Sequence, residues 1–236
     1  MLLVRAANPS PYTLSGTNTW VVGREPAWVV DPGPALESHL DAVAAAVAER
    51  GGAGGIALTH DHPDHAEGLD ALRERLGGPP VGAMPPLRDG NAFGPFNVLH
   101  VPGHAPDHLV FVHGGAAFTG DAVLGEGSVF IAPGGGSLGA YLSALRRLRG
   151  MGLSRLYPGH GPVVEDPAAK LDEYIAHRLE RERRIVAALE AGARTEDELL
   201  AAAWDEIPDG LRLPAAWTLT AHLDKLRGEG RLPAGM

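Results

Sequence analysis

The sequence contains no cysteine among its 236 residues. Disulfides and thiolate metal sites are therefore excluded, and histidine, aspartate and glutamate remain as the side chains that can bind a metal. No apolar run approaches the roughly 18 residues that a membrane-spanning helix needs. The first residues, Met1 to Arg5, lack the basic start and the apolar stretch of a signal peptide. These absences predict a cytoplasmic protein with no membrane partner.

Positive charge is also scarce, because the formal net charge is −9. Residues 1–160 carry 10 basic and 14 acidic side chains, and residues 161–236 carry 10 and 15. Neither part of the chain offers the basic field that attracts nucleic acid.

The first 165 residues combine short apolar strands in groups with a few helices. We expect strands at 19–22, 27–30, 55–58, 97–101, 109–112, 116–119, 128–131 and 156–157. We expect helices at 36–50, 66–76 and 138–149. Because the strands come in groups and do not alternate strictly with helices, the pattern favours an α+β fold of packed sheets flanked by helices.

From residue 167 onward the pattern is helical. Helices are expected at 168–191, 195–204 and 214–227, with a small hairpin wing at 228–232. Thr195 followed by Glu198 is a capping box, which favours a helix start. We therefore predict two domains, 1–166 and 167–236, the second helical and winged-helix-like.

The segment Thr59-His60-Asp61-His62-Pro63-Asp64-His65 follows an apolar strand and is dense in metal-binding side chains. Pro63 biases the residue before it toward an extended conformation. In an extended stretch His60, His62 and Asp64 project to one side, and His65 comes round as the next helix begins. The alternative is a polar surface loop, and so many ligand-type side chains at this spacing argue against it.

Three more candidate ligands each follow a strand and lie beside a glycine. They are His104 in Pro102-Gly103-His104, Asp121 in Gly120-Asp121 and His160 in Pro158-Gly159-His160. Glycine permits the sharp turns and close approaches that such sites need. With the first cluster they supply seven ligands, enough for two metals that share one carboxylate.

The order His-x-His-x-Asp-His, Gly-His, Gly-Asp and Pro-Gly-His resembles the metallo-β-lactamase superfamily. The resemblance implies an αββα sandwich of two mixed sheets between helices, with residues 1–166 as the catalytic domain. It implies one metal held by His60, His62 and His104 and a second held by Asp64, His65 and His160. Asp121 would bridge the two ions.

A binuclear centre of this kind implies a metal-dependent hydrolase. Two ions about 3.5–4 Å apart lower the pKa of a shared water, so a metal-bridged hydroxide is the expected nucleophile. Asp64 is the expected catalytic residue that orients this water or moves its proton. Zinc is the expected metal, and manganese and iron remain alternatives.

Three further residues are candidates for supporting roles around the metals or the substrate. His108 lies four residues after His104, and a ligand-orienting role and a buried hydrogen-bonded role are equally open. His177 and Arg178 are candidates because the stretch from Tyr174 to Glu182 resembles the endoribonuclease-like branch, also called β-lactamase-like protein two.

Several activities and partners remain open at this point. The stretch from Asn8 to Trp20 also resembles the endoribonuclease-like branch, which implies cleavage of single-stranded RNA. Acidity, including Asp61 beside the ligands, favours the alternative, a small ester or thioester hydrolysed as in glyoxalase II. A non-catalytic winged-helix regulator that binds nucleic acid is a third possibility. The Gly-rich stretch 132–137 is either a lip over the metals or, as we prefer, a plain connecting loop.

Overall fold

A computed structural model describes residues 1–132, 136–204, 206–208 and 210–232. The chain forms two compact units. The first comprises Met1–Val101, Asp107–Gly127 and Leu153–Pro167, and the second comprises Pro102–Pro106, Ser128–Gly152 and Ala168–Met236. Within the described residues no helix combines the length and the apolar character required to cross a bilayer. The predicted domain boundary after residue 166 stays a prediction.

The first unit contains two mixed five-stranded sheets. The first sheet has the order β1 (Leu2–Arg5), β2 (Asn18–Val22), β3 (Ala27–Val30), β4 (Ala53–Ala57) and β5 (Val81–Gly82). Strands β1 to β3 are antiparallel, whereas β3, β4 and β5 are parallel. A parallel pair needs a crossover, and α1 (Glu37–Ala48) supplies it between β3 and β4.

The second sheet has the order β10-β9-β8-β7-β6. Its strands are β6 (Ala92–Phe93), β7 (Phe96–His100), β8 (Leu109–His113), β9 (Ala116–Gly120) and β10 (Arg155–Pro158). Only β10 and β9 pair in parallel, and β10 lies at the edge of the sheet. The turn that follows β10 is therefore supported by this sheet on one side only.

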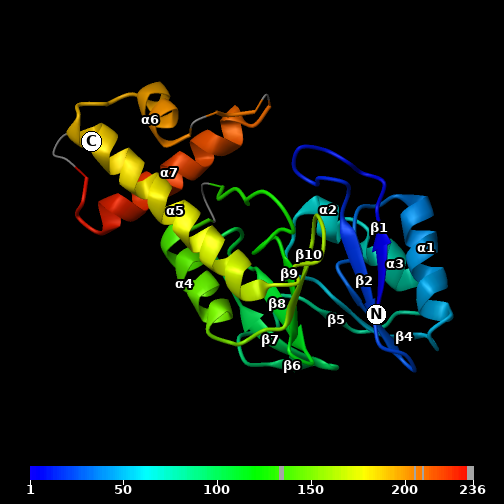
Figure 1. Cartoon of the computed structure of the whole chain (residues 1–236). Coiled ribbons are helices and arrows are strands. Elements are labelled where there is room, and N and C mark those ends of the chain that lie inside the picture. Colours follow the sequence, from blue (N-terminus) through cyan, green and yellow to red (C-terminus); the bar gives the residue numbers. More distant parts are fainter. Residues whose placement is uncertain (133–135, 205, 209, 233–236) are drawn as a thin grey trace. The chain divides into compact units, whose positions relative to one another are not determined.

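The two sheets pack through apolar side chains on their facing surfaces. This core contains Trp20, Val22, Val30, Ala57, Phe96, Val98, Leu109, Phe111, Phe118 and Tyr157. On the other face of the first sheet, Leu40 and Val43 of α1 and Leu72 of α3 (Leu69–Arg75) pack against buried strand residues. Figure 1 shows α1 and α3 on this outer face. Each large apolar side chain buried in this way contributes about 1.5–3 kcal/mol.

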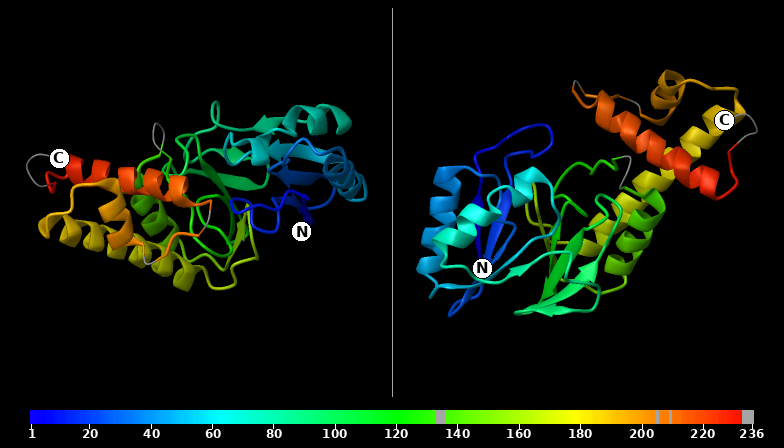
Figure 2. Two further views of the ribbon diagram at one scale, coloured as in Figure 1. Left: turned by 90° about the horizontal axis from the view of Figure 1, so that it is seen from above. Right: turned by 180° about the vertical axis from the view of Figure 1, so that it is seen from behind.

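The second unit is helical, with α4 (Leu138–Arg149), α5 (Pro167–Glu190), α6 (Glu196–Ala203) and α7 (Arg212–Gly228). Figure 2 shows α7 crossing α5. Their shared core includes Ile185, Leu189, Leu199, Leu219 and Leu226. The predicted capping box at the start of α6 is confirmed.

Two predictions about elements are wrong within the described residues, and the bounds of a third differ. The expected strand at 128–131 is irregular, because side chains take its backbone groups: Arg178 donates to the Val129 carbonyl and Ile131 N donates to Thr218. The expected helix at 66–76 is present as α3, which begins later, at Leu69, and a separate short helix, α2 (Pro63–Ala66), precedes it. No wing follows α7, because the helix continues through Gly228 and no strand is found up to residue 232.

The chain is therefore α+β, with two mixed sheets and helices. The short strands β1, β5 and β6 were not expected from the sequence, and two of them are only two residues long. Residues 133–135 of the Gly-rich stretch, for which we preferred a plain connecting loop to a lip, lie outside the described residues.

Candidate metal centre

Two parallel strands of the first sheet place the histidine-rich segment. Because β3 and β4 run in the same direction, their carboxyl ends meet at one edge, where Asp31 follows β3 and Thr59 follows β4. His62 is extended, with φ −76° and ψ 143°, as Pro63 requires. Helix α2 then turns His65 into the interior, where it is fully buried.

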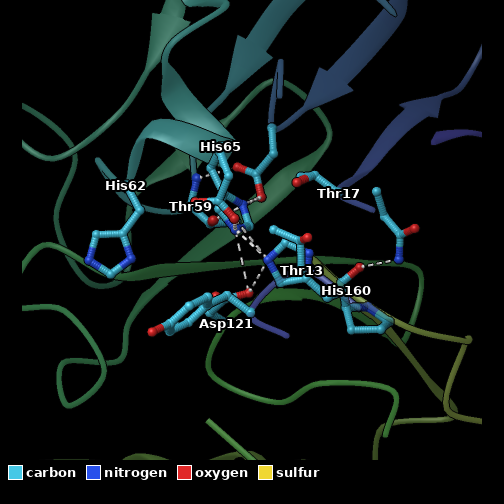
Figure 3. A network of polar contacts seen from close by, with 12 residues as sticks. Thr13, Thr17, Thr59, His62, His65, Asp121 and His160 are labelled. Carbon is cyan, nitrogen blue, oxygen red and sulfur yellow. Dashed lines mark hydrogen bonds and ion pairs between the residues drawn. The ribbon is translucent and has the colours of Figure 1, made fainter. Parts of the chain in front are cut away.

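Four ligand-type side chains of the first unit converge at this edge, and Figure 3 shows three of them, His65, Asp121 and His160, close together. The Nε2 atoms of His65 and His160 lie 3.2 Å apart. Asp64 Oδ2 lies 3.1 Å from His160 Nε2 and 3.6 Å from His65 Nε2. Asp121 Oδ1 lies 3.4 Å from each of the same two nitrogens. Asp64 and Asp121 therefore flank the point where the two imidazoles meet.

His60 and His62 form the neighbouring part of the site. His60 Nε2 lies 3.0 Å from His62 Nδ1, and the ring centroids of His60 and His65 are 4.3 Å apart. One ligand atom from each of His60, His65 and Asp121 falls within 4.8 Å of the others, as it does for Asp64, His65 and His160. Asp121 therefore lies where one carboxylate can serve two adjacent positions.

This donor set fits divalent cations. At most one proton can lie between two imidazole nitrogens that face each other at 3.2 Å, whereas a cation accepts both lone pairs together with the carboxylate oxygens. Burial lowers the pKa of His160, but the Asp121 and Asp64 carboxylates outweigh it and raise that pKa to about 9. Burial raises the pKa of Asp121, yet His160 and His65 hold it well below its ordinary value. The site therefore favours positive charge at its centre.

The far side of His65 is held by a buried carboxylate that the sequence reasoning missed. Asp31, 2% exposed, accepts from Thr59 N at 2.7 Å and Thr59 Oγ1 at 2.9 Å, and its Oδ2 lies 2.9 Å from His65 Nδ1. Such outer partners fix the tautomer of a ligating histidine. The available signal was Asp31-Pro32-Gly33 at a strand end, the same kind of position as the other ligands.

Residues behind His60 and Asp121 also contact these two side chains or their backbone. His60 Nδ1 lies 3.0 Å from Thr59 Oγ1. His108, fully buried, accepts at Nε2 from Asp121 N at 3.1 Å and stacks on His60 with ring centroids 4.7 Å apart. His108 is therefore buried and hydrogen-bonded beside the site, and both of its predicted roles stay predictions.

The remaining predicted site residues belong to the second unit. His104 Nδ1 lies 2.9 Å from the Phe130 carbonyl oxygen. Arg178 is buried and donates to Val129, and its guanidinium lies 5.6 Å from the Tyr141 ring centroid. Burial and nearby arginines lower the pKa of His177 to about 4. Their predicted roles at the metals or the substrate stay predictions.

Comparisons with known proteins find a matching family model and similar sequences. A family model described as the metallo-beta-lactamase superfamily matches residues 12–97 and 87–160. A Drosophila melanogaster protein named beta-lactamase-like protein 2 homolog is 31% identical over 98% of this chain and 89% of its own length. An atrochrysone carboxyl ACP thioesterase from Aspergillus chevalieri is 37% identical over 79% of this chain and 64% of its own.

A solved structure is similar as well. It is that of TTHA1623 in a di-iron-bound form, 27% identical, with a TM-score of 0.59 over 70% of this chain and 94% of that protein.

Proposed function

Because the chain belongs to the metallo-β-lactamase superfamily, whose members are hydrolases, we propose that it hydrolyses a carboxylic thioester with two divalent metal ions. The observation that carries the proposal is the meeting of His65, His160, Asp64 and Asp121 at one buried edge. In this reaction water adds to the thioester carbonyl, the carbon–sulfur bond breaks, and a carboxylic acid and a thiol leave.

The ligands of the two ions form the first part of the proposal. His60, His62 and His104 would hold one ion, Asp64, His65 and His160 would hold the other, and Asp121 would supply a carboxylate to both. When bound, the ions lower the pKa of water and stabilise the negative charge that develops on the carbonyl oxygen. Zinc suits this nitrogen and oxygen donor set, and iron is the alternative favoured by the likeness to TTHA1623.

Asp64 is the proposed catalytic residue. Its side chain is 28% exposed, so one carboxylate oxygen can contact His160 while the other reaches solvent. Burial raises the pKa of Asp64, but its hydrogen bond to His160 and the charge of His65 lower it below the ordinary value. The carboxylate therefore stays ionised at neutral pH, ready to accept a proton from the attacking water and pass it to the departing thiolate.

The acidic residues beside the proposed metal ligands favour a substrate with an uncharged reacting group over a polyanion. Asp61 is exposed, and its backbone N–H donates to the Asp107 carboxylate at 3.0 Å. Two carboxylates thus lie next to His60 and His108 in the chain, where they repel phosphates. A thioester carbonyl is not affected in this way, and the thioesterase relative from Aspergillus chevalieri is named for this bond.

Single-stranded RNA is the second candidate substrate. It is favoured by the likeness to beta-lactamase-like protein 2 over 98% of the chain, since the endoribonuclease-like branch carries the same name. The helix α5 arginines add little to it, because Arg183 and Arg184 both pair with Glu180, at 2.6 and 3.0 Å. With no wing in the described residues, a winged-helix regulator is not proposed.

The test compares the metal-loaded protein with its Asp64→Asn variant on two substrates in parallel. One is an acyl-coenzyme A thioester, read by thiol release, and the other is a labelled single-stranded RNA. We expect thiol release that falls at least 100-fold in the variant, within the range of general-base contributions. RNA cleavage without thiol release would replace the first substrate class with the second, and no turnover of either with both ions bound would refute both.

A further inference from the structure

The turn that carries His160 receives little support from its own sheet. It spans Pro158 to Gly161 after β10, the edge strand, and the ladder with β9 shifts register between Tyr157 and Pro158. Within this sheet's connections, Gly159 N donates to the Gly120 carbonyl at 2.9 Å and Gly125 N donates to the His160 carbonyl at 3.0 Å. The carbonyls of Pro158, Gly159 and Gly161 point elsewhere.

One residue of the first sheet takes all three of these carbonyls. Asn18, fully buried at the start of β2, donates from Nδ2 to Pro158 O at 3.1 Å and to Gly161 O at 2.9 Å. Its backbone N–H donates to Gly159 O at 2.7 Å. Its Oδ1 accepts from Arg5 Nε at 3.1 Å, so every polar atom of the side chain is used. The contacts lie on both sides of His160 and enclose it.

We propose that Asn18 is a positioning residue that aims His160 at the metal centre. The inference rests on the proposed function, in which His160 is a metal ligand. With its turn fixed, His160 Nε2 lies 3.1 Å from Asp64 Oδ2 and 3.2 Å from His65 Nε2. The imidazole receives little orientation from its own outer contact, because Nδ1 lies 3.5 Å from the Gly16 carbonyl oxygen. The backbone clamp supplies the orientation that this long contact lacks.

Only an asparagine-like side chain satisfies these contacts. Two carbonyl acceptors require the two N–H donors of one amide nitrogen, and Arg5 requires an acceptor on the same group. An aspartate at this position would have no N–H to donate, and its oxygen lone pairs would face the two carbonyl oxygens and repel them. An alanine would remove the amide donor from both carbonyls and leave the Pro158 carbonyl with the indole N–H of Trp20 at 3.1 Å, which loosens the turn around His160. Because a ligand displaced from its geometry binds a metal less well, changes to outer partners typically reduce metal affinity about 10–100-fold.

The test is a metal titration of Asn18→Ala against a matched control. Asn97→Ala is the control, because Asn97 also lies in a strand of the first unit but is exposed. Metal-free proteins are titrated with Zn²⁺ against a competing chelator, and with Co²⁺ for its visible absorption. For Asn18→Ala we expect one of the two ions to bind about 10–100-fold more weakly with an altered Co²⁺ spectrum, while the control binds both ions as the unaltered protein does.

The results distinguish a role of Asn18 in positioning His160 from a role in stabilising the fold alone. If Asn18→Ala has a lower melting temperature without metal but binds both ions with unchanged affinity and spectrum, the positioning role is refuted. If Asn18→Ala does not fold, Asn18→Ser, which keeps one short donor, is compared in the same way. If the unaltered protein binds no pair of ions, the proposed function fails and this inference fails with it. If it binds both and only the variant result is negative, the proposed function stands.

Discussion

Replacing Asp31 by asparagine tests whether a buried carboxylate sets the tautomer of His65, the proposed metal ligand. The carboxylate accepts all three of its contacts, two from Thr59 at 2.7 and 2.9 Å and one from His65 Nδ1 at 2.9 Å. Asparagine has nearly the same shape but only one acceptor oxygen. The substitution therefore changes the chemistry of the contact with little change in volume.

Each orientation of the new amide has a cost. If Oδ1 of the new asparagine keeps the hydrogen bond from the Thr59 N–H, its amide nitrogen faces His65 Nδ1. The His65 ring must then carry its proton on Nε2, the nitrogen that faces His160. If the amide is reversed, its N–H groups face the Thr59 N–H, and a buried donor left unpaired costs about 1–3 kcal/mol. The first orientation blocks the ligand atom and the second loses backbone support, so both weaken the site.

The expected magnitude is a 10–100-fold loss in affinity for one ion, or about 1.4–2.7 kcal/mol. The metal-free protein also loses a buried ion pair, since burial lowers the pKa of His65 but Asp121 and Asp31 hold it well above the ordinary value. Removing one partner of such a pair costs about 3–5 kcal/mol of unfolding free energy.

Chelator competition and urea unfolding measure these two losses for Asp31→Asn. Asp70→Asn is the control, because Asp70 is exposed on α3. Nitrogen-15 NMR of the histidine rings reports the tautomer of His65 directly. Wild-type affinity for both ions together with an unchanged tautomer would refute the reasoning.

Four further outcomes are expected. Because the pKa of His160 is about 9 in the metal-free fold and about 6.5 when unfolded, its stabilisation is complete below pH 6.5 and is lost as the pH rises toward 9. Urea unfolding of metal-free protein should then lose about 3 kcal/mol over that range, and a flat profile would contradict the assignment. Burial lowers the pKa of His222 to about 3, and neither ring nitrogen has a hydrogen-bond partner in the described part of the chain. This neutral histidine costs stability as the pH falls below 6.5, so His222→Leu should show a flatter decline in melting temperature in acid, and equal slopes would exclude this. Gly16→Ala, at φ +120°, places its Cβ 2.1 Å from the Ala6 carbonyl oxygen and should cost about 1–3 kcal/mol, whereas Gly139→Ala meets open space in a helix and should be neutral or stabilising. Chelation of the metals should lower the melting temperature, since ions at about 100 times their Kd add about 2.7 kcal/mol of stability, and an unchanged temperature would speak against a native metal site.

Local physics made the regular elements predictable. The strand Ala27–Val30 and the helix Leu138–Arg149 have the predicted bounds, because each has its own period of apolar residues and a clear start. The capping box of Thr195 and Glu198 is likewise complete within four residues. None of these features needs information from a distant part of the chain.

The wrong prediction of a strand at 128–131 arises because distant side chains take the hydrogen bonds of the backbone. The segment 128–131 has the composition of a strand, but Arg178 and Thr218, at least 49 residues away, take its hydrogen bonds. The glycines after residue 227 suggested a turn, and residues 229 and 230 do form one, but no strand follows it up to residue 232, so the described residues form no wing. Composition alone does not contain these partners.

The same distinction holds for the metal centre. The sequence by itself determined which side chains can bind metal, because without cysteine only imidazole and carboxylate remain, and because His60 to His65 lie within one short turn between a strand and a helix. Only the tertiary structure decided how they are held. Asp31 reaches His65 because two strands are parallel neighbours, and Asn18 reaches the His160 turn across 140 residues because two sheets pack face to face. Ligand chemistry is a property of single side chains, whereas orientation is a property of contacts that exist only after the chain has folded.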